Sequence, residues 1–350
     1  MKVIFSRKGF DSSYGGYPSI ILPEEMGSKM ISFPIPEAGT REKNKETGKY
    51  ENITSVGIRG MGAEDIKYML DDSPIFSLGE ILIDNLKLKD DEIKNPANGS
   101  KKTKIVDSIF HYDPQIQKIV DGNDYAAFGQ SGAAAGHLLN QEIRRGDVFL
   151  FFGTFRPTEI KKDGDKKTIN YTKEKDFHAL WGYMIVDDIF LIDAKNSSTL
   201  KKVEYNEKEE LKISECDIDK LKDYPNLSLH PHFDNKEKYK VINKKQETKY
   251  ITNLIICSKK GRFGTFNYTG KQKLTREGKD MSKRHWKLDH CFEGKKFSYC
   301  GSVYKDNNAF CLDSASIGQE FVVDNSDGKL NDWLKEILPK EAHKRLGLES

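Results

Sequence analysis

The sequence predicts an α+β fold with a mixed central sheet, an antiparallel hairpin, flanking helices and long charged insertions. Three observations favour this fold. Residues 148–155 (VFLFFGTF) are continuously apolar, which is typical of a strand buried on both faces. The apolar runs 178–186 and 189–192 are joined only by Asp187-Asp188, and strands joined by two residues pair antiparallel, so the sheet is not purely parallel. The charged stretch 161–175 is typical of an insertion between strands.

The remaining predicted elements are short. Extended segments are expected at residues 3–5, 20–23, 30–36 and 250–257. Charged loops are expected at 37–52 and 87–104, and helical segments at 64–70, 133–140, 207–221 and 330–338. Residues 125–128 are a poor strand candidate in front of the glycines that open the second of these helices. Because no repeat or linker marks a boundary, we predict one elaborated α/β domain spanning residues 1–350.

Composition points to a water-soluble protein of the cytoplasm. Hydrophobic residues make up 37% and charged residues 32% of the chain, and the mean hydropathy is -0.67. No apolar run approaches the roughly 20 residues that span a bilayer, and Met1-Lys2 leads into a strand rather than a secretory segment. The five cysteines are odd in number and irregularly spaced, which favours a reducing compartment. We therefore expect no membrane partner.

The net charge of +3 conceals a strongly basic segment. Residues 236–287 contain 16 Lys and Arg against 4 Asp and Glu, and aromatic residues are interspersed among the cations. Cations neutralise phosphates and rings stack on bases, so the segment predicts contact with DNA, in double-stranded form. The alternative is a solvated, lysine-rich loop region. The predicted DNA-binding residues are Lys259, Lys260, Arg262, Lys271, Lys273, Arg276, Lys283, Arg284 and Trp286.

The most suggestive loop follows the first predicted strand. Residues 6–16 (SRKGFDSSYGG) combine two cations, one carboxylate and three glycines. Arg7 and Lys8 can hold an anion, and Asp11 can act as a base, a nucleophile or a hydrogen-bond acceptor. The alternative is a surface turn whose charges are solvated.

Other candidates are scattered along the chain. Asp113 follows a strand-like run and His178 begins another strand, so both suit a polar site, although Asp113 also suits a turn and His178 a core histidine. Cleavage of an N-glycosidic bond needs a carboxylate beside the sugar. The glycines at 129–132 match no dinucleotide or P-loop motif, but that helix start can hold a phosphate oxygen, and Gln130 can read a base edge.

No metal or other cofactor is predicted. His285, His290, Cys291, Cys300 and Cys311 are close in sequence but lack a paired-ligand motif such as CxxC or HExxH. The segment His230-Pro231-His232 holds its imidazoles too rigidly apart for a convincing ligand pair, so a loop or a substrate contact is the favoured interpretation.

Five motifs together resemble the third class of nucleotide-modification-associated domain proteins. They are residues 6–16, 111–115 (HYDPQ), 128–133 (FGQSGA), 146–153 (GDVFLFFG) and 181–183 (WGY). The resemblance implies action on modified bases in DNA during conflict between phage and bacteria. By likeness to phage-defence DNA glycosylases, it implies a pocket lined by Arg7, Lys8, Asp11, Asp113, Gln130 and His178. Our catalytic candidates are Asp11, Asp113 and His178, and our substrate-binding candidates are Arg7, Lys8, Ser12, Tyr14, Gln115, Gln130 and Trp181.

The leading hypothesis is a DNA glycosylase that flips out and excises a hypermodified pyrimidine, such as glucosylated hydroxymethylcytosine, without a redox cofactor. Two alternatives remain. The pattern Gly146-Asp147 before a strand is also similar to barrels that bind modified bases, so a non-catalytic reader is the second hypothesis. A transferase that modifies a base with a soluble donor is the third hypothesis.

Overall fold

The computed structural model describes residues 1–37, 40–43, 50–53, 61–70, 73–96, 101–116, 124–164, 166–192, 199–205, 211–217, 221–233, 240–242, 248–250, 253–278, 282–314 and 320–349. Strands dominate these residues, and the predicted α+β class with a mixed sheet is confirmed. The described strands of the largest sheet run in an open order, so they do not close into a barrel. Among the described residues no helix has the length and apolar character required to cross a bilayer.

The main sheet is built around two neighbouring strands that pair in parallel, β1 and β13. β13 also pairs antiparallel with β15, so the sheet is mixed as predicted. The path through the sheet is β22 (Phe263–Thr265), β15 (Phe177–Ile185), β13 (Val148–Asp163), β1 (Lys2–Arg7) and β28 (Glu320–Asp324). Off this path lie β14 (Lys166–Tyr171), β2 (Ser19–Ile21) and β3 (Met30–Ile31).

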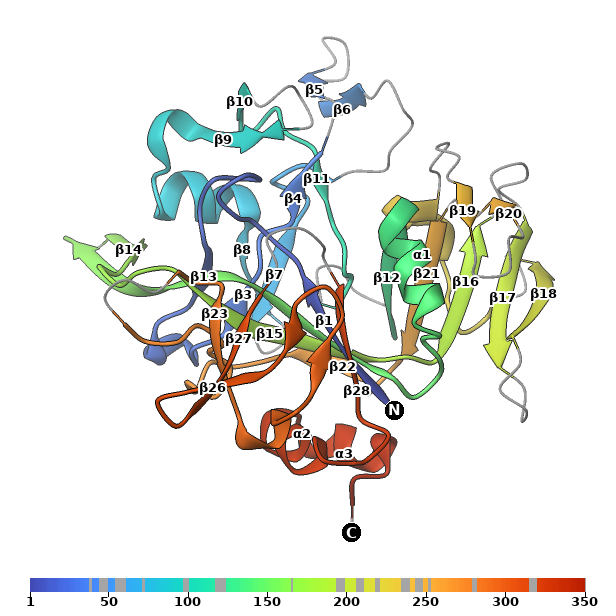
Figure 1. The fold of residues 1–350 in the computed structure, drawn as a ribbon. Coiled ribbons are helices and arrows are strands. Elements are labelled where there is room, and N and C mark those ends of the chain that lie inside the picture. Colours follow the sequence, from blue (N-terminus) through green and yellow to red (C-terminus); the bar gives the residue numbers. More distant parts are fainter. Residues whose placement is uncertain are drawn as a thin grey trace.

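A second, wholly antiparallel sheet lies beside the first and carries α1 (Gly132–Asn140), as the right side of Figure 1 shows. Its strand order is β12 (Tyr125–Ser131), β21 (Asn253–Lys259), β16 (Asp188–Ile192), β17 (Thr199–Tyr205) and β18 (Leu211–Asp217).

Smaller elements are also found within the described residues. Among these residues alone, six two-stranded sheets are formed by β4 (Ile35–Pro36) with β11 (Phe110–His111), β5 (Thr40–Lys43) with β6 (Tyr50–Ile53), β7 (Lys67–Leu70) with β8 (Ser73–Ser77), β9 (Glu92–Asn95) with β10 (Lys101–Lys104), β19 (Lys240–Ile242) with β20 (Thr248–Tyr250), and β24 (Lys296–Phe297) with β25 (Gly301–Ser302). A three-stranded sheet contains β23 (His285–Leu288), β27 (Ala309–Asp313) and β26 (Tyr304–Asp306). The helices are α2 (Asn331–Ile337) and α3 (Lys340–Leu346), with short helical turns at Glu24–Met26, Glu80–Asn85, Lys89–Asp91, Leu227–Leu229, Pro231–Phe233 and His290–Phe292.

The two faces of the main sheet are covered by different parts of the chain. On one face the Phe5 ring packs against Trp286, with ring centroids 5.9 Å apart, and against Trp333 of α2 at 6.1 Å. On the other face Phe128 of β12 packs against Phe149 and Phe151 of β13, at 5.1 and 5.6 Å. Successive side chains of a strand point to opposite faces, so β1 contributes to both layers.

One predicted hairpin is wrong. β15 and β16 do not pair with each other, because the chain passes from the main sheet into the second sheet at Asp187. The partner strands β21 and β22 make the same passage, with Arg262 between them. The buried Asp187 carboxylate accepts a hydrogen bond from Lys259 N–H at 2.8 Å and lies 3.0 Å from the Arg262 guanidinium. Asp187-Asp188 is therefore a bend at which two paired strands pass from one sheet to the other, and the contacts of Asp187 hold this bend in place. An antiparallel hairpin is found elsewhere, between β13 and β14.

Several local predictions are also corrected. Within the described residues, the helix expected at 207–221 is replaced by β18, which pairs with the preceding strand β17; strand pairing here overrides weak local propensity. Residues 67–70 form β7 rather than a helical turn, and 125–131 form a strand whose alanines allow burial on both faces. The charged loop 87–104 contains the hairpin β9–β10. The segments 44–49 and 97–100 of the predicted charged loops lie outside the described residues.

Other predictions are confirmed. The strands at 3–5, 148–155, 178–186 and 250–257 correspond to β1, β13, β15 and β21, with residues 251–252 outside the described part. The small-residue helix and the C-terminal helix correspond to α1 and α2. The prediction of a single domain is not tested by these observations and stays a prediction.

Phe5 is fully buried among four aromatic rings on one face of the main sheet. Replacing it by alanine therefore leaves a cavity between the sheet and the rings that cover it. We expect Phe5→Ala to lower the free energy of unfolding by about 3–5 kcal/mol, measured by urea unfolding. Tyr304→Ala is the matched control, because the Tyr304 side chain is exposed and its loss should cost less than about 1 kcal/mol. Equal losses in the two variants would contradict the layered core.

Candidate functional site

The end of β1 separates two cations onto the two faces of the main sheet. Arg7 lies on the face of Phe5, with its guanidinium carbon 5.7 Å from the centre of the Phe152 ring. Lys8 lies on the other face, with Nζ 4.4 Å from the centre of the Phe128 ring. Each cation belongs to its own polar group. The cationic cluster comprises Arg7, Asp11, His178, Lys283 and Arg284, and the histidine cluster comprises Lys8, His111, Asp113, His230 and His232.

Asp11 organises the loop that follows β1. Its Oδ1 accepts hydrogen bonds from the backbone N–H groups of Ser13 (2.7 Å) and Tyr14 (2.8 Å), which is an Asx-type turn. Gly15 is required here, because a Cβ at this position would lie 2.2 Å from the Phe10 ring and φ is +75°. Oδ2 of Asp11 makes no hydrogen bond within the described residues, and the side chain is partly exposed. Oδ1 of Asp11 thus holds the loop in its conformation, and Oδ2 remains available to contact a ligand.

The charges of the cationic cluster act on one another. Burial lowers the pKa of Arg7; Asp11 opposes this shift and Arg284 adds to it. Burial also lowers the pKa of Lys283; the charges of Asp176 and Asp11 oppose this shift, and that of Arg7 adds to it. Lys283 Nζ donates to Thr154 Oγ1 at 3.3 Å, so the basic segment contacts β13 at this point. Cations gathered in this way attract an anionic ligand.

His178 borders the cationic cluster as a neutral side chain. Its Nδ1 accepts a hydrogen bond from the Trp286 indole N–H at 3.1 Å, so the proton of the neutral ring is on Nε2. Burial, reinforced by the charges of Arg7, Lys283 and Arg284, holds the pKa of His178 well below its ordinary value. The sequence analysis weighs His178 as a catalytic or a core residue, and the structure gives it a core position next to a polar site.

Asp113 lies at the centre of the histidine cluster and its side chain is completely buried. Oδ1 accepts a hydrogen bond from Gly129 N–H at 2.8 Å and lies 3.3 Å from His230 Nε2. Oδ2 lies 3.3 Å from Lys8 Nζ. Burial alone would raise the pKa of Asp113, but the charge of Lys8 and the contact with His230 hold it well below its usual range. Asp113 is therefore a permanent anion. Its carboxylate contacts a lysine and a histidine from other segments, which a residue that only caps a local turn would not do.

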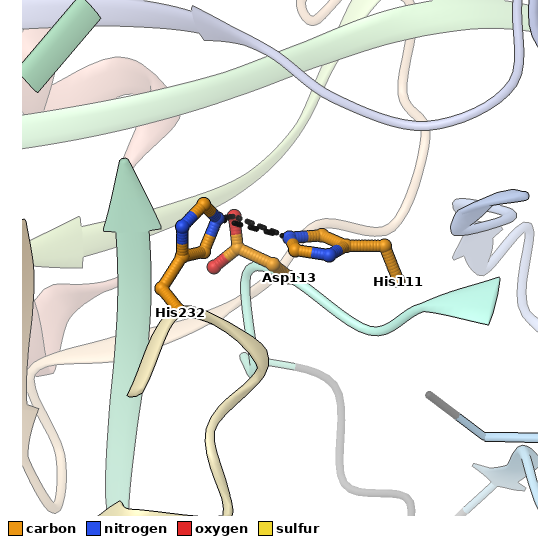
Figure 2. Close-up of side chains that lie close together, drawn as sticks. All are labelled: His111, Asp113 and His232. Carbon is orange, nitrogen blue, oxygen red and sulfur yellow. Dashed lines mark hydrogen bonds and ion pairs between the residues drawn. The ribbon is translucent and has the colours of Figure 1, made fainter. Parts of the chain in front are cut away.

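His111 and His232 face each other beside this carboxylate, as Figure 2 shows. Their Nε2 atoms are 3.0 Å apart, and each lies 3.9 Å from Asp113 Oδ2. His111 Nδ1 contacts Glu37 Oε1. Burial opposes the charge on His111, yet Glu37 raises its pKa above the ordinary value, whereas burial and His111 lower the pKa of His232.

The sequence analysis missed this arrangement. His230 and His232 are not splayed apart, because both rings approach Asp113 and their centroids are 5.8 Å apart. The available signals were the spacing His111-x-Asp113 and the pair His230-x-His232, but His111 and His232 are 121 positions apart in the chain, so neither signal predicts the other. The cysteines and histidines between 285 and 311 form no comparable ligand group in the described residues.

Gln130 lies on the same side of the main sheet as the histidine cluster and is hydrogen-bonded to the buried carboxyl group of Glu320. Gln130 Nε2 donates to Glu320 Oε1 at 2.5 Å, and Ser6 Oγ donates to the same oxygen at 3.2 Å. Burial raises the pKa of the Glu320 carboxyl. Glu320 is a further residue that the sequence analysis did not select, since nothing in an isolated strand such as β28 shows that its acid faces inward.

The other predicted substrate contacts are spread more widely. Ser12 and Tyr14 are exposed in the opening loop, next to Asp11. Gln115 follows Asp113 and donates its backbone N–H to the Ala127 carbonyl at 2.8 Å. Trp181 is buried in the core against Phe151, so its ring is not presented to a substrate in this conformation.

Many of the described cations of the basic segment pair with carboxylates, most of which belong to other parts of the chain. Six of the predicted DNA-binding cations pair with carboxylates: Lys259 with Asp223, Lys260 with Asp124, Arg262 with Asp187, Lys271 with Glu336, Lys273 with Glu277 and Arg276 with Asp306. Trp286 is fully buried and is a core residue rather than an exposed stacking surface. Lys283 and Arg284 form no ion pair with a described carboxylate, and they are the two that reach the cationic cluster.

Together, the two-layered mixed sheet and the polar groups on either side of β1 define an α+β protein with a buried Asp–His centre and a separate cationic cluster. Comparison of the sequence with known families gives a more specific result. The chain belongs to the family of nucleotide modification associated domain 3, whose model matches residues 2–324. The resemblance seen in the motifs is thereby confirmed, and the family has a role in nucleotide modification systems. Neither a curated protein nor a solved structure matches the chain.

Glu320 gives a prediction about the pH dependence of stability. Because the pKa of Glu320 is raised in the folded protein, its contribution to stability is present below the ordinary pKa of glutamate and is lost as the pH rises through the shifted pKa. Glu320→Gln stays neutral, and its amide oxygen can still accept from Ser6 and Gln130. We expect the variant to lose less stability than the wild-type protein between about pH 4 and about pH 8, measured by urea unfolding.

The exposed Glu293 supplies the matched control. Glu293→Gln should leave the wild-type pH dependence unchanged. If Glu320→Gln behaves like this control, the buried carboxyl does not contribute to the pH dependence.

Proposed function

We propose that the protein is an N-glycosidic bond hydrolase that removes a modified base from DNA, with the cationic cluster as its active site. The observation that carries the proposal is that Asp11 acts on the charges of both Arg7 and Lys283, with Arg284 acting on Arg7 as well. Cations bind the phosphates of a DNA backbone. A carboxylate next to the sugar stabilises the positive charge that develops there when the base leaves. Membership of a family associated with nucleotide modification supports a modified base as the substrate.

The proposed chemistry assigns one role to each side chain. Asp11 Oδ2 stabilises the positive charge that develops on the sugar when the bond to the base breaks, while Oδ1 keeps the loop in place. Water adds its oxygen to the sugar carbon as the bond from that carbon to the base breaks, and the proton that the water loses ends on the departing base. His178, which is buried beside these residues with its proton on Nε2, is given no direct contact with the base. Arg7, Lys283 and Arg284 bind the flanking phosphates.

The base must leave the duplex to reach a carboxylate at a strand end, so the reaction includes base flipping. Following the resemblance of the motifs, we propose a hypermodified pyrimidine, such as glucosylated hydroxymethylcytosine, as the excised base and phage defence as the setting. Asp113 is not assigned a direct role in this reaction, because its carboxylate is fully buried and engaged by Lys8 and Gly129.

Asp11→Asn tests the carboxylate. Asparagine keeps an oxygen that can accept from Ser13 and Tyr14 N–H, so the loop is preserved while the negative charge is removed. We expect base release from modified DNA, measured as alkali-labile strand breaks, to fall by about 100-fold or more, with DNA retention in a gel shift unchanged. Release at the wild-type rate by the Asp11→Asn protein would falsify the role of Asp11.

The same assay separates the alternatives. Wild-type protein that retains modified DNA without producing breaks is a reader, and a gain in mass of the base identifies a transferase. Either result contradicts hydrolysis. Breaks in modified DNA and none in unmodified DNA support the glycosylase.

The salt dependence of binding tests the cations. Removing Lys283 and Arg284 together as glutamines should reduce the slope of log K against log salt by about 2, because each phosphate contact contributes about 0.9. The matched control is the double substitution Lys259→Gln and Lys260→Gln, in which both lysines already pair with Asp223 and Asp124. Equal changes of slope in the two variants would show that the sequence segment as a whole, and not the cationic cluster, contacts phosphate.

A further inference from the structure

We propose that His111, Asp113 and His232 form a binding site for a divalent transition-metal ion. Two imidazoles and one carboxylate are a ligand set that suits Zn²⁺, Fe²⁺ and Co²⁺ better than Mg²⁺ or Ca²⁺, which prefer oxygen ligands only. The candidate ligand atoms lie within 4.8 Å of one another. The site belongs to the opposite layer from the cationic cluster and is not part of the proposed base excision.

The geometry favours a shared ion. The Nε2 atoms of His111 and His232 point toward each other and toward Asp113 (Figure 2), with an Nε2–Nε2 separation of 3.0 Å. Ligand nitrogens that bind one ion at about 2.0–2.1 Å lie about that far apart when they occupy neighbouring positions. The two distances of 3.9 Å to Asp113 Oδ2 require a modest approach of the carboxylate oxygen, and the remaining positions are left for water or a ligand.

The groups around the ligands orient them as outer-shell residues of metal sites do. Glu37 contacts His111 Nδ1, so that Nε2 of the same ring is directed to the centre. Asp113 Oδ1 is occupied by Gly129 N–H and His230, which leaves Oδ2 to face the two imidazoles. The approach of His232 depends on Gly129, because a Cβ there would lie 2.2 Å from the imidazole carbon Cδ2.

Lys8 is the feature that opposes the metal. Its ammonium lies 3.3 Å from Asp113 Oδ2, the oxygen assigned to the ion, and like charges repel strongly in a buried setting. The lysine therefore weakens the site without blocking its ligand nitrogens. If the histidines bind a metal ion, removal of Lys8 should therefore increase the affinity for that ion. A histidine pair with a purely structural role would not show this effect.

The experiment titrates the EDTA-treated full-length protein with Zn²⁺ by calorimetry and with Co²⁺ by visible absorption. We expect one ion per chain, with Co²⁺ bands of a site that includes nitrogen ligands. His232→Ala should weaken Zn²⁺ binding by about 100-fold or more, and Glu37→Gln by about 10-fold to 100-fold as expected for an outer-shell partner. Lys8→Gln should bind Zn²⁺ more tightly than the wild-type protein.

His285→Ala is the matched control, because His285 also contacts a carboxylate, Asp313, but on the surface. It should retain wild-type affinity and stoichiometry. The proposal is overturned if the wild-type protein binds no Zn²⁺ beyond the level of nonspecific surface binding, or if His232→Ala and His285→Ala behave alike. Should His232→Ala fail to fold by circular dichroism, the opposite shifts expected for Glu37→Gln and Lys8→Gln decide the question. Base release by the Asp11→Asn protein is measured separately, so failure of the metal site and failure of the proposed hydrolase are distinguishable.

Discussion

The parallel pairing of β1 with β13 is the constraint on which both polar clusters depend. In its register Ser6 lies opposite Phe151 and Arg7 opposite Phe152, so the polar residues at the strand end alternate between the two layers. A slip of one residue would exchange the faces of Arg7 and Lys8. Gly153 fixes the place where β1 ends, because a Cβ there would lie 2.6 Å from the Lys8 carbonyl oxygen, while Lys8 N–H donates to the Phe152 carbonyl.

The distribution of charge in the sequence differs from its distribution in the folded protein. Residues 236–287 have an excess of cations in the sequence, but several of their partners, such as Asp124, Asp187 and Glu336, come from distant segments. Exposed pairs of this kind contribute little to stability, yet they reduce the local positive potential. Lys283 and Arg284 form no ion pair with a described carboxylate and act electrostatically on Arg7 and His178, which no count of charges along the chain can show.

The sequence is informative where a local pattern determines the structure. The apolar run 148–155 predicts a central buried strand, and the glycine-rich loop after residue 5 predicts a polar strand end; both are observed. The hairpin at Asp187-Asp188 could not be distinguished from a bend, because the two differ in the partners of the strands and not in the turn residues. The histidine cluster combines residues 111 and 113, which precede β12, with residues 230 and 232, which come about 100 positions after it. Only the folded chain brings these segments together beside β12.

The two clusters lie on opposite sides of one strand, and different charges dominate the pKa shifts within each. The charges that shift the pKa of Asp113 come from Lys8, His230 and His232, whereas those that shift the pKa of His178 come from Arg7, Lys283 and Arg284. The apolar layers of β1 and β13 lie between them, so changes in one cluster should add to changes in the other rather than cooperate. A metal ion held by the histidines would thus order the layer that carries β12, while an anion beside Asp11 would be bound by the opposite layer. The fold therefore positions a buried Asp–His centre and a cationic cluster on opposite sides of the same strand.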